Sequence, residues 1–242
     1  MASDPKPETN LDLEAGAPRR LYPSMTENPA LRWVFIRKVY TTLIVQLLLT
    51  AAVAATVALV RPVTLFFVDT YAGLGVLIAD FVLALAVVVA LRFCGKKYPV
   101  NFILMGLFTV LIGVIVGMHC VFTQEKVLLG AFGITLVIFI SLTLYTFWAA
   151  RRGYDFSFLG PFLFAALTVL IGFSLIQIFH PLGKTSHMII TLVGCIIFCG
   201  YIVYDTDKLI KRHEYDEYML AAVQLYLDAI NLFMNLSATL KS

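Results

Sequence analysis

Charged residues are scarce in this chain. Only 14% of its 242 residues are Asp, Glu, Lys or Arg, whereas 60% are hydrophobic. This balance lies far outside the usual composition of soluble domains, so it predicts an integral membrane protein. The formal net charge is only +3, and we expect no nucleic-acid partner.

Motifs for cofactor chemistry are also missing. The four cysteines form no C-x-x-C pair, and the sequence contains neither a His/Cys cluster with metal-ligand spacing nor a Gly-rich phosphate loop. We therefore expect no resident cofactor. A retinal protein is excluded as well, because the last apolar run has no lysine before Lys241 to form a Schiff base.

What the sequence does have is a series of long apolar runs. A helix of about 20 apolar residues crosses the hydrocarbon core of a bilayer. Such runs occur near residues 39–60, 71–91, 101–122, 127–148, 158–179, 187–206 and 218–240. They predict an all-α membrane protein, a seven-transmembrane-helix bundle over residues 31–242. Residues 1–30 carry acids and prolines with little apolar material, which predicts a disordered cytosolic tail.

The basic residues favour one side of this arrangement. Fourteen of the 18 Lys and Arg residues fall before the first run or in the loops that follow the second, fourth and sixth runs, and four fall on the other side. Because cytosolic loops are enriched in Lys and Arg, the N-terminus is predicted to be cytosolic.

The seventh run carries a stripe of polar residues. Gln224, Asp228, Asn231 and Asn235 are spaced by four, three and four residues, which places them on one face of a helix. Such a face is costly in lipid, so we expect it to turn toward the bundle interior and the helix to be central. The amides alone would fit a helix-packing seam of hydrogen bonds, whereas the carboxylate favours a functional path.

Asp205, near the end of the sixth run, is the expected partner of Asp228. The two lie about eleven residues before and about twelve residues after a charged turn near residue 216, so antiparallel helices would place them at a similar depth. Two such carboxylates are expected to share a proton and to titrate as a pair, which would make them a pH sensor. When ionised, they would form a weak, transient Ca²⁺ site. Asp207 is expected to be solvated or to lie at the helix end.

Asp80, in the second run, is a third deep carboxylate. It could line the same cavity as the pair, or it could pair with an amide or basic group elsewhere in the bundle; both interpretations remain open. On the third run, Gly113 and Gly117 form a small-xxx-small pattern that predicts close helix contact.

Several longer motifs resemble one family. They are "LRWVFIRKVY" at 31–40, "YPVNFILMGLFT" at 98–109, "LTLYTFWAARRGYDFSFLGPFLF" at 142–164, "FCGYIVYDTDKLIKRHEYDEY" at 198–218 and "LYLDAINLF" at 225–233. Their order and sequence are similar to those of the Bax inhibitor (transmembrane Bax inhibitor motif) proteins, in the plant form of the lifeguard branch.

The resemblance implies a seven-helix bundle, a pH-dependent Ca²⁺ leak across the endoplasmic reticulum or another internal membrane, and suppression of stress-induced cell death. It also implies that Asp205 and Asp228 are the pH-sensing pair, and that Arg92, Lys96 and Lys97 occupy the region of a basic cytosolic latch. Many relatives carry a polar residue early in the fourth helix, where this chain has Gly130. A step of ion passage that uses that polar group is therefore absent from this chain or depends on another residue. The expected partners are membrane lipids, Ca²⁺ and membrane proteins of cell-death or stress signalling.

Two other function classes compete with the leak. The bundle could be a non-conducting scaffold that regulates cell death through protein partners. It could also be an intramembrane aspartyl protease, which needs two facing aspartates, but the G-x-G-D motif of such enzymes is absent because Leu225, Tyr226 and Leu227 precede Asp228. We therefore expect no enzyme.

Overall fold

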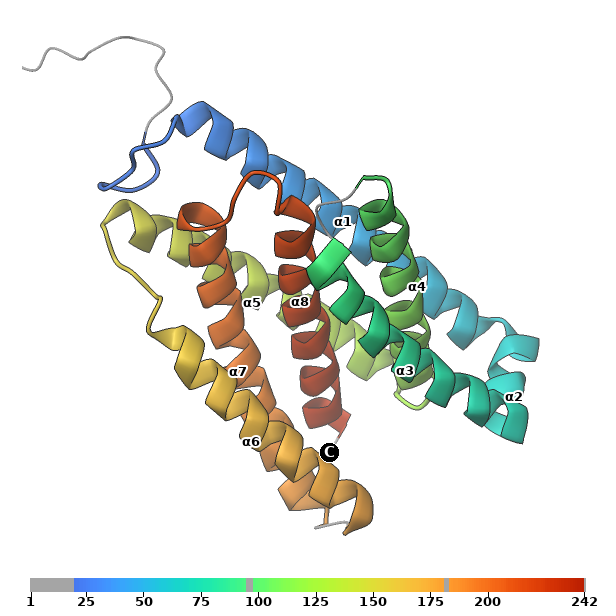
Figure 1. Ribbon diagram of the computed structural model, residues 1–242. Helices are drawn as coiled ribbons and strands as arrows, with labels where there is room; N and C mark the ends of the chain where they lie inside the picture. The colour runs from blue at the N-terminus through green and yellow to red at the C-terminus, as the bar shows by residue number, and fades with distance from the viewer. Residues whose placement is uncertain (1–19, 95–97, 181–182, 242) are drawn as a thin grey trace, which may run out of the picture.

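The described residues form a bundle of α-helices. The computed structural model describes residues 20–94, 98–180 and 183–241, and every element within them is a helix. The helices are α1 (Pro29–Leu59), α2 (Arg61–Asp69), α3 (Tyr71–Cys94), α4 (Val100–Val121), α5 (Glu125–Arg151), α6 (Leu159–Phe179), α7 (Lys184–Lys211) and α8 (Tyr218–Lys241) (Figure 1). All except α2 are long and apolar enough to cross a membrane. The predicted seven-helix membrane bundle is confirmed.

Helix α1 begins ten residues before the first apolar run. Asn28 caps it by accepting a hydrogen bond from the Ala30 backbone N–H at 2.9 Å, and Pro29 occupies the first turn, where its missing N–H costs little. Residues 20–28, which the sequence assigns to the tail, include Leu21 and Met25, and both side chains are buried in the core. Residues 1–19 of that tail lie outside the described residues.

Helix α2 was not predicted. It is a nine-residue helix that begins beside Pro62, and at about 1.5 Å per residue it is far too short to span a bilayer. The helix fills the connection between the first two spans and packs against α1 and α3.

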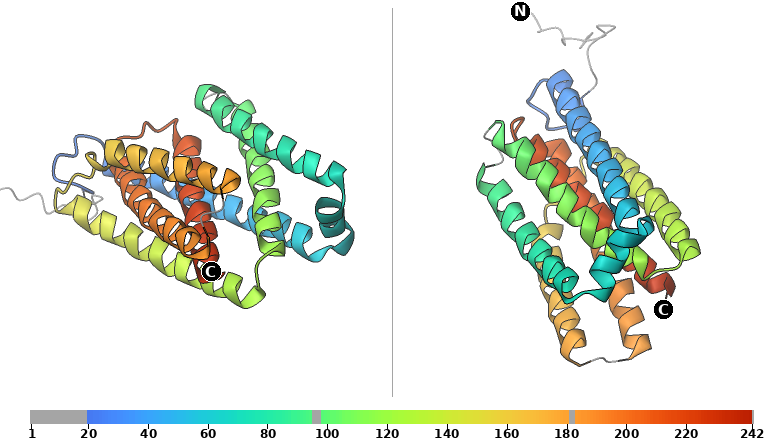
Figure 2. Two further views of the ribbon diagram at one scale, coloured as in Figure 1. Left: turned by 90° about the horizontal axis from the view of Figure 1, so that it is seen from below. Right: turned by 90° about the vertical axis from the view of Figure 1, so that its right-hand side faces the viewer.

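The seventh span, α8, is the centre of the bundle. It packs against α1, α4, α5 and α7, and in both views of Figure 2 it runs among the other helices. In its most apolar stretch 56% of the residues are buried, the largest share among the seven spans. The prediction of a central seventh helix is confirmed.

Helix α6 is the most peripheral span. Only 6% of its apolar window is buried, and among the described residues α7 is the only helix against which it packs extensively. Its outward side chains, such as Phe162 and Phe164, are exposed and are suited to contact with lipid.

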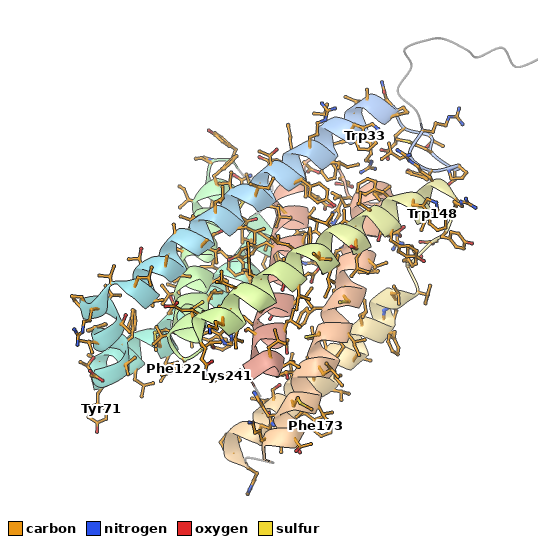
Figure 3. All side chains as sticks on the ribbon, turned by 180° about the vertical axis from the view of Figure 1, so that it is seen from behind. Trp33, Tyr71, Phe122, Trp148, Phe173 and Lys241 are labelled. Atoms are coloured by element: carbon orange, nitrogen blue, oxygen red, sulfur yellow. The ribbon has the colours of Figure 1, made fainter. Side chains whose placement is uncertain are left out.

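Aromatic residues mark the ends of the bundle. Trp33 and Trp148 lie near one end, whereas Tyr71, Phe122 and Lys241 lie toward the other (Figure 3). Tryptophan and tyrosine favour the membrane interfaces, so we expect the membrane normal to point from one of these ends of the bundle to the other.

Candidate functional site

A cavity of about 550 Å³ lies where α6, α7 and α8 meet. The polar side chains that line it come mainly from α8, and most of its apolar ones come from α6. The lining includes all four residues of the predicted stripe together with Asp205: Gln224, Asp228, Asn231, Asn235 and Asp205. The structure therefore brings these five residues to one site.

Asp205 and Asp228 face each other across the α7–α8 contact. The two residues are only 7% and 5% exposed, and their carboxyl groups lie close enough for a hydrogen bond when one of them is protonated. A hydrogen bond between two carboxyl groups requires a proton on one of them, because two carboxylates have only acceptors. Asp228 Oδ2 has no hydrogen-bond partner among the described residues.

The two asparagines of the stripe each use one side-chain donor within their own helix. Asn231 Nδ2 donates to the Leu227 carbonyl, and Asn235 Nδ2 donates to the Asn231 carbonyl, each at 2.8 Å. These bonds run along α8 and not between helices, which differs from the packing seam considered above. They leave the amide oxygens of both residues as acceptors.

Asp80 is not brought to this cavity. It lies on α3, it is 8% exposed, and it is not one of the residues that line the space. Its Oδ2 atom has no hydrogen-bond partner within the described part of the chain, so at that oxygen the structure supplies no pairing amide or basic group. Gly130 lies on α5, where an added Cβ would meet no atom within 4 Å.

Of the three basic residues in the predicted latch, only Arg92 can be placed. It is exposed in the last turn of α3. Lys96 and Lys97 lie outside the described residues, so the latch stays a prediction.

Asp207 corrects an expectation. Its side chain is not solvated but fully buried, and it forms ion pairs with Lys211 at 2.5 Å and Arg212 at 2.8 Å. Arg212 also pairs with Asp155 in the α5–α6 connection at 2.7 Å. Hydrogen bonds from Ser157 lower the pKa of Asp155 to about 2, and Arg212 adds to this shift. The cluster ties the end of α7 to the α5–α6 connection.

A second cluster joins the start of α1 to the α7–α8 turn, and we call it the clasp: Glu27, Arg32, His213, Tyr215 and Glu217. Arg32 is 1% exposed and donates to the His213 carbonyl at 2.6 Å and to Glu27 at 2.8 Å. Tyr215 donates its hydroxyl to the same Glu27 carboxylate, and its ring lies under the Arg32 guanidinium.

The imidazole of His213 is buried within the clasp. Its Nδ1 atom lies 3.1 Å from Glu217 Oε2, whereas Nε2 lacks a partner among the described residues. Burial lowers the pKa of His213; Glu217 opposes that shift and Lys208 adds to it. Sequence reasoning missed the clasp, because it counted Arg32 only as a basic residue of the cytosolic side.

Comparisons with known proteins agree on one family. Residues 32–242 match the family described as "Inhibitor of apoptosis-promoting Bax1". The chain is 57% identical to "Protein LIFEGUARD 3" of Arabidopsis thaliana over 96% of this chain and 94% of that protein. It is 34% identical to "Bax inhibitor 1" of Schizosaccharomyces pombe over 88% of this chain and 84% of that protein. It is also 38% identical to "Golgi anti-apoptotic protein" of vaccinia virus (strain Lister) over 85% of this chain and 84% of that protein. This chain, a multi-pass membrane protein by its seven apolar spans, therefore belongs to the Bax inhibitor family, in the plant form of its lifeguard branch.

Proposed function

We propose that the protein suppresses programmed cell death and does so as a pH-sensitive Ca²⁺ leak in an internal membrane. The names of two relatives, "Bax inhibitor 1" and "Golgi anti-apoptotic protein", support the role in cell death and, for the second, an internal membrane. The single observation that supports the leak is the Asp205/Asp228 pair inside a cavity of about 550 Å³.

The pair couples proton occupancy to helix packing. With one shared proton, the two carboxyl groups attract each other across the contact between α7 and α8. Once that proton is lost, two like charges face each other in a poorly solvated site and repel. A change of pH would thus bias the separation of α7 from the central helix, which is a two-state element of the kind that gates a path.

The ionised pair also suits the passage of a divalent cation. Carboxylate and amide oxygens are the ligands that Ca²⁺ prefers, but a tight site supplies six to eight of them. Two carboxylates with the Asn231 and Asn235 oxygens fall short of that number, and conduction needs an ion to leave as readily as it enters. We therefore propose Asp205 and Asp228 as transient ligands and not as a storage site.

Ca²⁺ flux through purified protein in liposomes, measured from pH 5 to pH 8, tests this function. Wild-type flux should change with pH, and Asp205→Asn or Asp228→Asn should remove that dependence. Asp80→Asn is the matched control, because it neutralises a buried carboxylate that does not line the cavity, and its flux should follow the wild type. No flux above that of empty liposomes at any pH would overturn the leak.

A non-conducting scaffold is the second candidate. The names "Bax inhibitor 1" and "Golgi anti-apoptotic protein" describe control of cell death, and a bundle that acts through protein partners would also provide it. On this alternative, Asp228→Asn would leave both partner capture and cell-death suppression unchanged. On the leak proposal, the same variant would lose suppression while it kept partner capture.

A further inference from the structure

The cavity has two walls of different chemistry. The α8 side presents amides and a carboxyl group, whereas the α6 side presents the aliphatic side chains Leu167, Leu170, Ile171 and Leu175. A bare cation would contact only the polar wall. The aliphatic wall therefore indicates a ligand with an apolar part.

The polar wall offers acceptors and negative charge. Asn231 and Asn235 each donate one side-chain N–H within α8 and keep the amide oxygen as an acceptor, and Ser174 Oγ donates to the Leu170 carbonyl within α6. Asp228 is 5% exposed, and its Oδ2 atom lacks a partner among the described residues. No Lys, Arg or His is among the residues described as lining the cavity. With one shared proton, the Asp205/Asp228 pair carries a single negative charge, so the matching group is a cation with several N–H donors.

The mouth of the cavity faces the bilayer. Ile171 and Leu175 line the cavity, and yet each is 52% exposed. Both belong to α6, a membrane span, so the surface to which they are exposed is hydrocarbon. A ligand would enter sideways from the membrane, which requires it to carry an alkyl chain.

We propose that this cavity binds a long-chain primary amine. The ammonium group would lie between the Asp205/Asp228 pair and the amide oxygens of α8, and the alkyl chain would run along the aliphatic wall of α6. Charge-assisted hydrogen bonds to carboxylate are among the strongest that proteins make, and a volume of about 550 Å³ is within the usual range for one small ligand. This binding goes beyond the proposed leak and requires no ion conduction.

Photolabelling tests the proposal with the full-length protein. The probe is a 12-carbon primary amine with a diazirine on its alkyl chain, added to protein in phosphatidylcholine nanodiscs without Ca²⁺, and the labelled peptides are mapped by mass spectrometry. Labelling should fall within residues 167–175 of α6. Dodecylamine should compete with the probe. Dodecanol, dodecanoate and methylamine should not compete, because dodecanol is uncharged, dodecanoate is negatively charged and methylamine has no long alkyl chain.

Two variants and a control locate the ligand. Asp228→Asn should weaken the apparent affinity about tenfold or more, the factor expected from the loss of a charged hydrogen bond. Ile171→Trp should abolish labelling by filling the cavity, whereas Ile176→Trp should not, because Ile176 is 49% exposed on the same helix but does not line the space. Equal competition by dodecanol and dodecylamine, or labelling that survives Ile171→Trp, would overturn the proposal. Since no Ca²⁺ is present, failure of the leak would not affect this result.

Discussion

The contact between α1 and α4 makes a prediction about two glycines of the same helix. A Cβ atom added to Gly117 would lie 2.7 Å from Val57 Cβ and 3.1 Å from Ala54 Cα on α1. At Gly106, also on α4, an added Cβ would meet no atom within 4 Å. Gly117→Ala should therefore lower the stability of the protein, whereas Gly106→Ala should raise it.

The size of the change in unfolding free energy follows from two terms. Alanine is favoured over glycine inside a helix by about 0.8–1 kcal/mol, and both variants gain this term. Carbon atoms pack best at about 3.5–4.0 Å, so at Gly117 α1 must move away by nearly 1 Å, and overpacking of this kind costs about 1–3 kcal/mol. The difference between Gly117→Ala and Gly106→Ala isolates the second term and should be about 2 kcal/mol.

Unfolding of the purified protein by SDS titration in mixed micelles measures this difference. Gly113 is a further check, because its added Cβ would lie 2.8 Å from Val53 Cβ on the same side of α1. One displacement of α1 relieves both clashes, so Gly113→Ala/Gly117→Ala should cost less than the two single changes added together. If Gly117→Ala stabilises as much as Gly106→Ala does, the close approach of α1 to α4 is wrong.

Three further predictions concern the ends of α1 and α7. Arg32→Met should destabilise the clasp by about 2–3 kcal/mol, because the buried His213 carbonyl and the Glu27 carboxylate each lose a charged donor; faster hydrogen exchange around residues 20–32 would report it, and unchanged exchange would contradict it. Arg212→Gln should cost about 1–2 kcal/mol in SDS titration, since Asp207 is fully buried and keeps only one ion-pair partner among the described residues; no loss would mean that this ion pair contributes nothing. Burial lowers the pKa of His213, so the unfolded turn binds the proton more readily and the clasp should weaken as the pH falls below about 6.5. His213→Gln should flatten that dependence in hydrogen exchange of residues 213–217 measured at pH 5.5 and pH 7.5.

The spans and the polar stripe were predictable because both depend on local periodicity. Long apolar runs fix where helices cross the membrane, and a spacing of three and four residues fixes which side chains share a face. The pairing of Asp205 with Asp228 needed one more step, the symmetry of two antiparallel helices about a short turn. That step succeeded because α7 and α8 are consecutive and packed along their lengths.

Features that depend on contacts distant in sequence were not predictable. Arg32 and His213 are 181 residues apart, and nothing in either segment indicates that one buries the other. Asp207 is buried because Arg212 and Lys211 fold back over it, although the (i, i+4) spacing of Asp207 and Lys211 was a signal that could have been used. Asp80 illustrates the same limit, since its position on α3 relative to the cavity depends on how the helices pack around α8.

The clasp and the aspartate pair are close enough to be coupled. Gln224 lines the cavity one turn before Asp228, and its side chain also lies near the His213 ring. A pH-dependent flux in the wild type could therefore arise at either site, and comparing two variants separates them. Because His213 does not line the cavity, we expect His213→Gln to keep a pH-dependent flux that Asp228→Asn loses. The opposite result, dependence lost with His213→Gln and kept with Asp228→Asn, would place the sensor in the clasp and leave the pair a structural role at the α7–α8 contact.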